Sequence, residues 1–339
     1  MSKIKWTLSM FVVLGVSLVL AACGSSGDSG GGGGDIPSKP ESGTFRMGIE
    51  PWLGYGPWRI AEEKGFFKKN GIDVEITNFT TDDQINAAFA AGKLDGTNIA
   101  THTALRFAAS GLPIKITLLE DESTTADAIM SGKDVKSVKD MKGQKVAYEE
   151  GTTSDILLSY ALAQNGLTKD DITSVPIPAA DAGTTFIAGK VPFAVTYEPY
   201  LTTALNEDSN AKLLYTAGEK PGIVSDVFVA SEDTVNNKPG QLLALAKSWN
   251  EAVEYYYSNT AEAQAIIEKS VGADPGSLKT AFAGVKFYTL DEMKDLLNGE
   301  FADQTITDVY NAAKDAGLID GSVDPKNLID TQFVDEATK

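Results

Sequence analysis

The sequence predicts an α/β protein with two lobes, each built on a largely parallel sheet with helices on its faces, followed by a helical tail. Short strands and helices alternate from residue 45 to residue 230, as in sheets that are covered by helices. The alternation runs through two successive cycles, and residues 238–316 are mainly helical. Two α/β units followed by helices indicate two lobes with a cleft between them.

The elements follow from hydrophobic periodicity and from glycine signals at the helix ends. The first cycle is predicted to have strands at 45–49, 73–79, 96–99 and 114–119, and helices at 58–70, 82–91 and 101–110. The second cycle is predicted to have strands at 127–131, 145–148, 172–177, 193–197, 212–215 and 226–230, and helices at 153–165 and 181–188. The tail is predicted to have helices at 241–257, 260–270, 275–283, 290–298 and 305–316.

The N-terminal region predicts export and a lipid anchor. Lys3 and Lys5 precede an apolar run at 6–20, which is too short to span a bilayer, since spanning takes about 20 apolar residues. A positive start, a short apolar run and small residues are typical of a secretory signal peptide at 1–22. The sequence Leu20-Ala-Ala-Cys23 resembles the bacterial lipobox, in which the cysteine is acylated and becomes the first mature residue. The alternative is a plain signal cleavage beside an incidental cysteine.

Cys23 is the only cysteine of the chain, so no disulfide framework is expected. A thioether to diacylglycerol would explain this lone thiol, and a diacyl anchor holds stably. The residues that follow, 23–43, are rich in glycine and serine, which predicts a flexible tether.

Composition limits the possible partners. The chain is 42% hydrophobic and 22% charged, as in a soluble globular protein. Cleavage after residue 22 removes Lys3 and Lys5 but no acid, which changes the formal net charge from −18 to −20. Such acidity argues against binding nucleic acid, which needs a basic face. It also repels anionic lipid headgroups, so the lipid itself must hold the protein at the membrane.

The sequence gives no sign of an enzyme. It contains no P-loop, no Gly-x-Gly-x-x-Gly fingerprint, and no Gly-x-Ser-x-Gly elbow between a predicted strand and a predicted helix. His102 is the only histidine and has no evident serine partner, so neither a catalytic set nor a metal site is expected. We therefore expect no catalytic residues and no cofactor.

Several segments carry a family resemblance. They are 137–148 followed by Gly151-Thr152-Thr153, then 54–58, 63–75, 91–96 and Tyr197-Glu198-Pro199. Together they resemble ABC-importer solute-binding proteins of the branch for nitrate, taurine, alkanesulfonates and pyrimidine precursors of thiamine. The similarity runs from about residue 45 to about residue 249. It implies a type II periplasmic binding protein-like fold, with two α/β lobes joined by hinges near 121–126 and 230–235. It places lobe 1 at 44–125 and 232–339 and lobe 2 at 126–231.

The resemblance also implies partners and a location. A monomer anchored on the extracytoplasmic face of the cell membrane would capture a small solute and deliver it to an ABC permease with its ATPase. One alternative is a sensor protein that presents the ligand to a membrane receptor. A remote alternative is an enzyme of the pyrimidine-synthase-like branch, which depends on a histidine and a cysteine cluster that this sequence lacks.

Two helix starts are candidate ligand contacts. Thr152 and Thr153 open a predicted helix, whose first N–H groups have no intrahelical partner and carry partial positive charge. The alternative is ordinary N-capping. Thr101 and His102 open the corresponding helix of the first lobe, where sulfonate-binding relatives have small residues. A lone histidine is also often structural.

Aromatic residues form a second group of candidates. Trp52 and Tyr55 lie in the glycine- and proline-rich loop after the first strand and are favoured over Trp58. Tyr148 and Tyr197 end strands of the second lobe. Facing rings can sandwich a planar group or surround a cation. Packing in the core is the alternative for each ring.

Acids form the third group. Asp226 begins the predicted last strand of the second lobe, where taurine-type relatives place an acid against the ligand amine. Asp121 and Glu198 are further acids that fit the cleft. Arginine is the usual bidentate partner of anions, yet the chain has only Arg46, Arg59 and Arg106, of which Arg59 is the one candidate. The sequence therefore favours a zwitterion, a cation or a neutral planar heterocycle over a bare anion.

Overall fold

The computed structural model describes residues 36–79 and 82–339. The predicted signal peptide, Cys23 and most of the predicted tether lie outside the described residues. Within the described part of the chain, no helix is long and apolar enough to cross a membrane.

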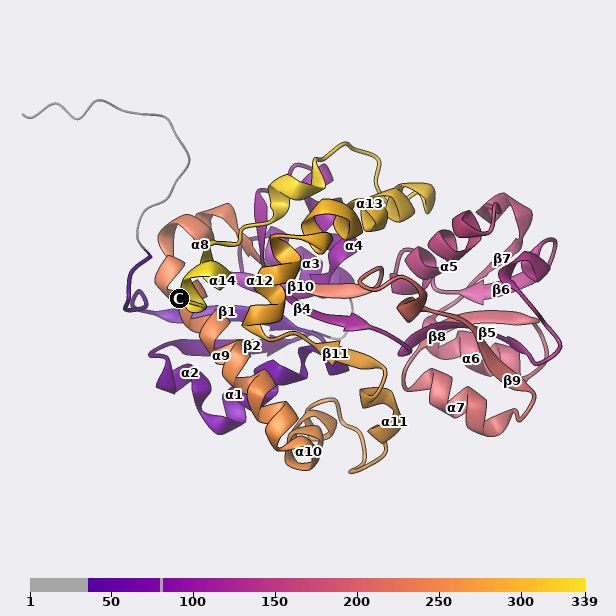
Figure 1. Cartoon of the computed structure of the whole chain (residues 1–339), viewed down its shortest axis with the longest axis horizontal. Coiled ribbons are helices and arrows are strands. Elements are labelled where there is room, and N and C mark those ends of the chain that lie inside the picture. The colour runs from indigo at the N-terminus through magenta and orange to yellow at the C-terminus, as the bar shows by residue number, and fades with distance from the viewer. Residues whose placement is uncertain (1–35, 80–81) are drawn as a thin grey trace, which may run out of the picture. The chain divides into compact units, whose positions relative to one another are not determined.

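The described strands form two mixed sheets (Figure 1). The first sheet has the order β11 (Val285–Phe287), β4 (Ile114–Ser123), β10 (Ser225–Ser231), β3 (Gly96–Ala100), β1 (Thr44–Ile49) and β2 (Asp73–Asn78). The second sheet has the order β7 (Thr173–Pro176), β6 (Lys145–Tyr148), β8 (Phe193–Tyr197), β5 (Asp127–Gly132) and β9 (Ala211–Thr216). β1 pairs in parallel with β2 and β3, and β6 with β7 and β8, whereas the pairs of β4, β5 and β10 are antiparallel. The sheets are therefore less parallel than the sequence predicts.

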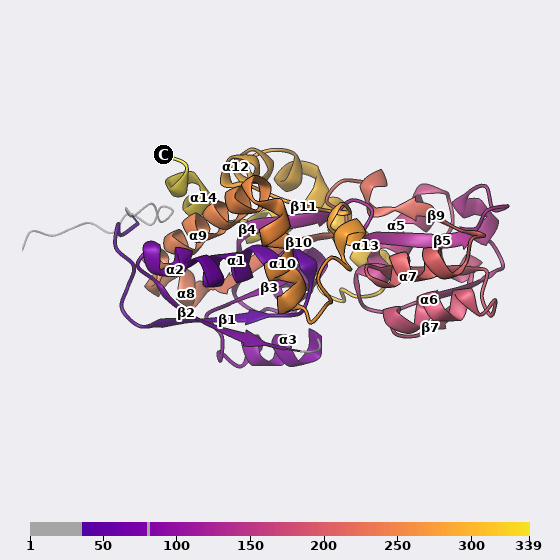
Figure 2. The same cartoon turned by 90° about the horizontal axis from the view of Figure 1, so that it is seen from below.

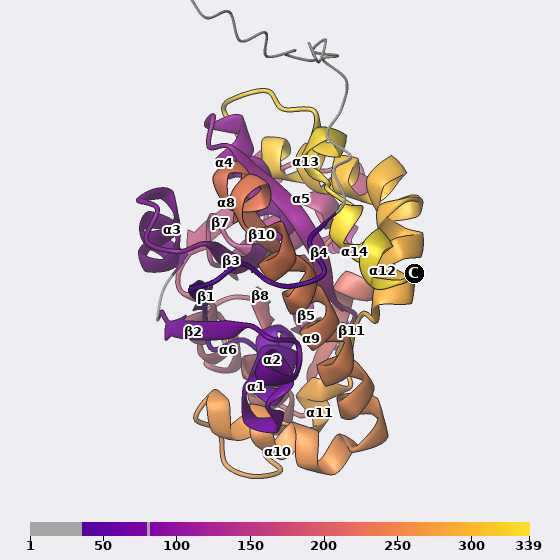
Figure 3. The same ribbon diagram turned by 90° about the vertical axis from the view of Figure 1, so that its left-hand side faces the viewer.

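Helices cover both faces of each sheet. α3 (Asp82–Ala90) and α4 (Thr101–Ala109) lie on one side of the first sheet, and α9 (Pro239–Ser258), α12 (Leu290–Leu297) and α14 (Gln332–Ala337) lie on the other (Figure 3). α5 (Thr153–Gln164) covers one face of the second sheet, and α6 (Ala179–Ile187) and α7 (Tyr200–Glu207) cover the other (Figure 1). The remaining α-helices are α1 (Gly56–Lys64), α2 (Phe66–Lys69), α8 (Glu232–Asn237), α10 (Thr260–Ser270), α11 (Lys279–Phe282) and α13 (Ile306–Asp315).

The chain passes between the two sheets twice. The first crossing, at 124–126 between β4 and β5, lies inside the predicted hinge at 121–126. The second crossing lies at 217–224, between β9 and β10, so the prediction of a hinge near 230–235 is wrong. The sequence predicts β10 as the last strand of the second lobe. This prediction is wrong, because β10 pairs with β3 and β4 in the first sheet. The order of the strands along the chain does not reveal that β10 belongs to the first sheet. This pairing places Asp226 in the first sheet.

Local chemistry explains two further differences from the sequence. The predicted helix at 58–70 is divided into α1 and α2 by Gly65, whose φ of 75° is left-handed and ends a helix readily. Trp58 on α1 is fully buried, with its ring 4.9 Å from that of Trp249 and 5.5 Å from that of Phe228. It is therefore a core residue, in agreement with the preference for Trp52 and Tyr55 as ligand contacts.

Helix α13 follows the π-helical turn η5 (Phe301–Thr305) and packs against both α4 and α5. Figure 2 shows α13 beside α5. Lys220 at the second crossing pairs with Asp308 of α13, with Nζ 2.9 Å from the carboxylate. Lys169 donates a hydrogen bond of 3.4 Å to the carbonyl of Ala316, just after the same helix. The helical tail thus contacts elements of both lobes.

Candidate functional site

Two carboxyl groups lie side by side where the strands leave the first sheet. Asp121 on β4 is the cross-strand partner of Asp226 on β10. Directly opposed residues of an antiparallel pair share one face, with Cβ atoms about 5 Å apart. Asp121 is fully buried and Asp226 is 6% exposed. The structure therefore brings together two acids that the sequence analysis named separately.

The loop after β1 covers this pair with aromatic side chains. Tyr55 is buried, and its hydroxyl donates a hydrogen bond of 2.9 Å to Asp226 Oδ1. A Cβ atom on Gly54 would lie 2.0 Å from Asp121 Oδ2 and 2.3 Å from Trp52 Nε1. These two polar atoms are thus close neighbours, and only glycine leaves room for them. Trp52 and Tyr55 consequently flank the Asp121–Asp226 pair.

The second sheet contributes to the same region. The ring of Tyr197, at the end of β8, meets the ring of Trp52 edge-to-face at 6.2 Å. Tyr197 is the cross-strand partner of Asp127, which begins β5 and is 2% exposed. Thr153, the first residue of α5, donates a hydrogen bond of 3.2 Å to Asp127 Oδ1. The candidate site therefore draws side chains from both sheets.

The predicted helix start in the first lobe lies beside Asp226. Thr101 donates a hydrogen bond of 3.0 Å to the carbonyl of Ser225 and lies 2.8 Å from the Ser225 hydroxyl. His102 is 4% exposed, and its Nε2 lies 3.4 Å from the Thr103 hydroxyl. Thr101 thus fixes the start of β10 to the start of α4, with His102 next to it.

Three other predicted contacts are engaged in local structure. Thr152 is the N-cap of α5, since its hydroxyl accepts a hydrogen bond from Ser154 N. Glu198 accepts two hydrogen bonds from Thr202, 3.0 Å from its N and 2.8 Å from its hydroxyl, in the first turn of α7. Tyr148 is 1% exposed, with its hydroxyl 3.2 Å from that of Ser174. The structure gives these three residues capping and packing partners.

Burial and mutual repulsion change the ionisation of the acids. Burial raises the pKa of Asp121 well above its usual range, and the adjacent Asp226 raises it further. Burial likewise raises the pKa of Glu120 well above its usual range. The Trp58 N–H donates a hydrogen bond of 2.6 Å to Glu120, which lowers the pKa but does not offset burial. Burial raises the pKa of Asp127 to about 7, with the hydrogen bonds from Ser123 and Thr153 opposing the shift. These acids favour their protonated forms when no cation is near them.

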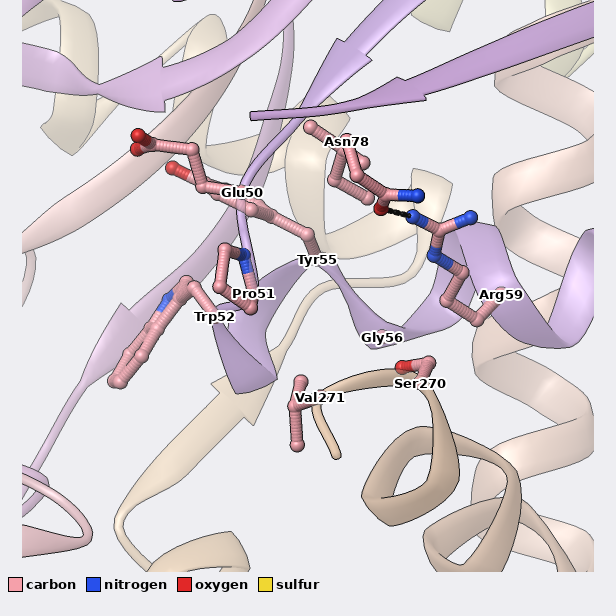
Figure 4. A pocket seen from close by; sticks show the side chains of 10 residues that line it. Glu50, Pro51, Trp52, Tyr55, Gly56, Arg59, Asn78, Ser270 and Val271 are labelled. Carbon is pink, nitrogen blue, oxygen red and sulfur yellow. Dashed lines mark hydrogen bonds between the residues drawn. The ribbon is translucent and has the colours of Figure 1, made fainter. Parts of the chain in front are cut away.

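The surface pocket beside the aromatic loop contains both Trp52 and Arg59 (Figure 4). Figure 4 shows Glu50 and Trp52 on one side of the loop and Arg59 on the other. The Arg59 guanidinium donates hydrogen bonds to Asn78 and, over 3.1 Å, to Glu62. Both terminal nitrogens of Arg59 therefore already donate to protein partners.

Sequence reasoning missed three residues of the site. Asp127 and Glu120 are buried acids, and Gly54 provides the space for Trp52 and Asp121. The run Glu120-Asp121-Glu122 at the end of an apolar strand was a usable signal, because consecutive acids at a strand end are costly to bury. For Asp127 the only signal was its position just after a predicted hinge.

Comparison with known proteins identifies the family. A family model described as "NMT1/THI5 like" matches residues 55–263. The match covers more than half of the chain, so the protein belongs to the NMT1/THI5-like family. The resemblance to solute-binding proteins of this branch is thereby confirmed.

Individual relatives agree with this assignment. The chain is 25% identical over 97% of its length, and 96% of the relative, to a Bacillus subtilis protein whose name provisionally assigns it to aliphatic sulfonate binding. It is 23% identical, over 65% of its length and 68% of the relative, to the yeast 4-amino-5-hydroxymethyl-2-methylpyrimidine phosphate synthase THI13.

Solved structures show the fold. The periplasmic aliphatic sulphonate binding protein SsuA of Escherichia coli superimposes with a TM-score of 0.74 at 20% identity, covering 85% of this chain and 98% of SsuA. The periplasmic nitrate-binding protein NrtA of Synechocystis PCC 6803 superimposes with a TM-score of 0.65 at 19% identity, covering 88% of this chain and 89% of NrtA. The predicted two-lobe, periplasmic binding protein-like fold is confirmed.

Proposed function

We propose that this protein is the extracytoplasmic substrate-binding component of an ABC importer, held at the cell membrane by a lipid anchor on Cys23. Family membership and fold support a binding role, and the lipobox-like sequence supports the anchor. The main support for this proposal is the site itself. There the Trp52 ring of the first lobe contacts the Tyr197 ring of the second lobe, beside the buried Asp121–Asp226 pair. Residues from both lobes thus have access to one ligand.

The proposed solute is a small nitrogen- or sulfur-containing organic molecule with a zwitterionic, cationic or neutral planar group. Trp52, Tyr55 and Tyr197 supply flat apolar contacts, which suit such groups. Thr101, His102 and Thr153 supply polar contacts at two helix starts. Asp121 and Asp226 disfavour a bare anion, because a buried carboxylate repels negative charge.

The proposed mechanism is closure of the two lobes on the ligand. The crossings at 124–126 and 217–224 join the sheets, and rotations there would bring the two halves of the site together. Closure excludes water and stabilises the form that a permease would recognise. Ligand presentation to a membrane receptor uses the same closure, so cellular uptake of the ligand separates the two functions. A sensor would leave uptake unchanged when its gene is deleted.

A thermal-shift screen of the purified full chain in detergent tests the binding role. A ligand at a hundred times its dissociation constant stabilises the folded state by about 2.7 kcal/mol. Gly54→Ala should lose most of this stabilisation, because the new Cβ would displace Asp121 and Trp52. The matched control is Gly132→Ala, whose Cβ would meet only Asn210 at an ordinary 3.6 Å. Equal ligand responses in the two variants would refute the site.

A further inference from the structure

The two crossings between the sheets are hydrogen-bonded to each other. The first crossing begins at Thr124, whose carbonyl accepts a hydrogen bond of 2.6 Å from Gly218 N of the second crossing. One residue earlier, Ser123 N donates a hydrogen bond of 3.0 Å to the carbonyl of Val224, at the end of the second crossing. A Cβ atom on Gly218 would lie 2.8 Å from the Thr124 carbonyl oxygen, so a side chain there would separate the two crossings. The crossings therefore form a single two-stranded connection.

A loop of the helical tail adds a third segment to this connection. Gly284 immediately precedes β11, which pairs with the end of β4 (Figure 1). The carbonyl oxygen of this glycine accepts hydrogen bonds from Thr124 N at 2.8 Å and from Thr125 N and Ala126 N at 3.3 Å each. The Thr124 hydroxyl donates to the same oxygen over 3.0 Å. The three N–H groups of the first crossing thus converge on one acceptor in the tail.

The Gly284 carbonyl is shared by more donors than it can bind at full strength. A carbonyl oxygen has two lone pairs, whereas four donors lie within hydrogen-bonding distance of this one. The bonds from Thr125 and Ala126 are also longer than the usual N–H···O distance of about 2.9 Å. When the backbone of the crossing rotates, one N–H can replace another on the same oxygen. The crossing can therefore turn while Gly284 keeps a hydrogen-bond donor.

We propose that the Gly284 carbonyl is the pivot of the hinge between the lobes, and that Gly218 makes the second crossing turn together with the first. This inference rests on the proposed closure of the lobes and names the atoms about which the lobes rotate. It gives a conformational role to a residue of the tail that lies in neither crossing. Hinge rotation is absorbed by a few loop or element-terminal residues, and Thr124, Gly218 and Gly284 all have such positions.

The space around Gly284 is as tight as the space around Gly218. A Cβ atom on Gly284 would lie 2.7 Å from Ala126 N and 3.0 Å from the Thr125 hydroxyl. Neither glycine has a left-handed backbone, so alanine at either position meets a steric obstacle without added backbone strain. The new methyl group would push the first crossing away from its acceptor or from the second crossing. Since neither glycine is a candidate ligand contact, both substitutions test the hinge separately from the binding site.

The test is a measurement of the distance between the lobes in the purified full chain without ligand. Spin labels at Lys93→Cys in the first lobe and Lys190→Cys in the second, both exposed positions, report this distance by pulsed electron paramagnetic resonance. A Cys23→Ser background avoids labelling of the native cysteine. We expect Gly284→Ala and Gly218→Ala to shift or narrow the distance distribution, because the first crossing loses part of its rotation.

Gly132→Ala on β5 is the matched control, because its Cβ would meet Asn210 at an ordinary 3.6 Å, and it should leave the distribution unchanged. Hydrogen exchange of the amides at 124–126 should be about fivefold faster in Gly284→Ala, as expected for the loss of one hydrogen bond. An unchanged distance distribution in Gly284→Ala, even with lower stability, would overturn the pivot. An equal shift in Gly132→Ala would do the same.

Thr124→Val decides the question if the glycine variants do not fold. It keeps the N–H group and the shape of Thr124 but removes the hydroxyl that donates to Gly284. A changed distance distribution in this variant supports the pivot, and an unchanged one overturns it. These measurements use no ligand, so failure of the pivot leaves the proposed binding role to the thermal-shift screen. A screen without any ligand response would count against the binding role alone.

Discussion

At the scale of single residues, the burial of Asp127 just after the first crossing between the sheets makes the stability of the protein depend on pH. The pKa of Asp127 is raised to about 7, so the folded protein holds this proton at pH values where the unfolded chain has released it. The free energy of unfolding should therefore decrease as pH rises from below about 4 to above about 7, by about 4 kcal/mol from this group. Asp127→Asn should remove that part of the pH dependence and stabilise the ligand-free protein at pH 8. Denaturant unfolding at pH 5 and pH 8 measures it, with Glu75→Gln as the charge control.

Single residues also show which parts of the candidate site can be predicted from the sequence alone. Asp121 and Asp226 were predictable as separate acids, because each stands at the end of an apolar strand. Their pairing was not, because it depends on the register between β4 and β10, two strands far apart in the chain. Gly54 is similar: its importance lies in the absence of a Cβ beside Asp121, which only the folded structure reveals.

At the scale of elements, α7 offers a test of what Glu198 does. Its carboxylate accepts hydrogen bonds from the Thr202 N–H and hydroxyl in the first turn, where free N–H groups and the helix dipole favour an anion. Glu198→Ala should lower the free energy of unfolding by about 1 kcal/mol, as the loss of a cap does. It should leave ligand affinity unchanged. A large loss of affinity with unchanged stability, by unfolding and titration, would instead make Glu198 a ligand contact.

The elements themselves were largely predictable from periodicity, because alternating strands and helices mark their own boundaries. The exceptions have physical causes. Gly65 ends α1 where apolar residues continue, and the three-residue β11 is too short to show a pattern. β10 was recognised as a strand but assigned to the wrong sheet, because its burial on both faces fits the centre of either one.

At the scale of the whole molecule, the described tail links the two lobes. Lys220 of the second crossing pairs with Asp308, and Lys169 reaches the end of α13. Sequence reading treated this tail as the least distinctive part of the chain, since amphipathic helices look alike wherever they pack. The proposed closure of the lobes would therefore have to preserve or break these two contacts.

The last prediction concerns how the molecule is held at the membrane. The proposed signal cleavage would leave a formal net charge of −20, so anionic lipid would repel the protein body and the proposed acyl chains would have to retain it. Cys23→Ser should therefore release the protein from the membrane fraction at every salt concentration and abolish labelling by radioactive palmitate. Ser26→Ala, three residues away in the tether, should remain membrane-bound and labelled. Retention of Cys23→Ser that high salt reverses would point to electrostatic attachment instead, which the charge of this chain opposes.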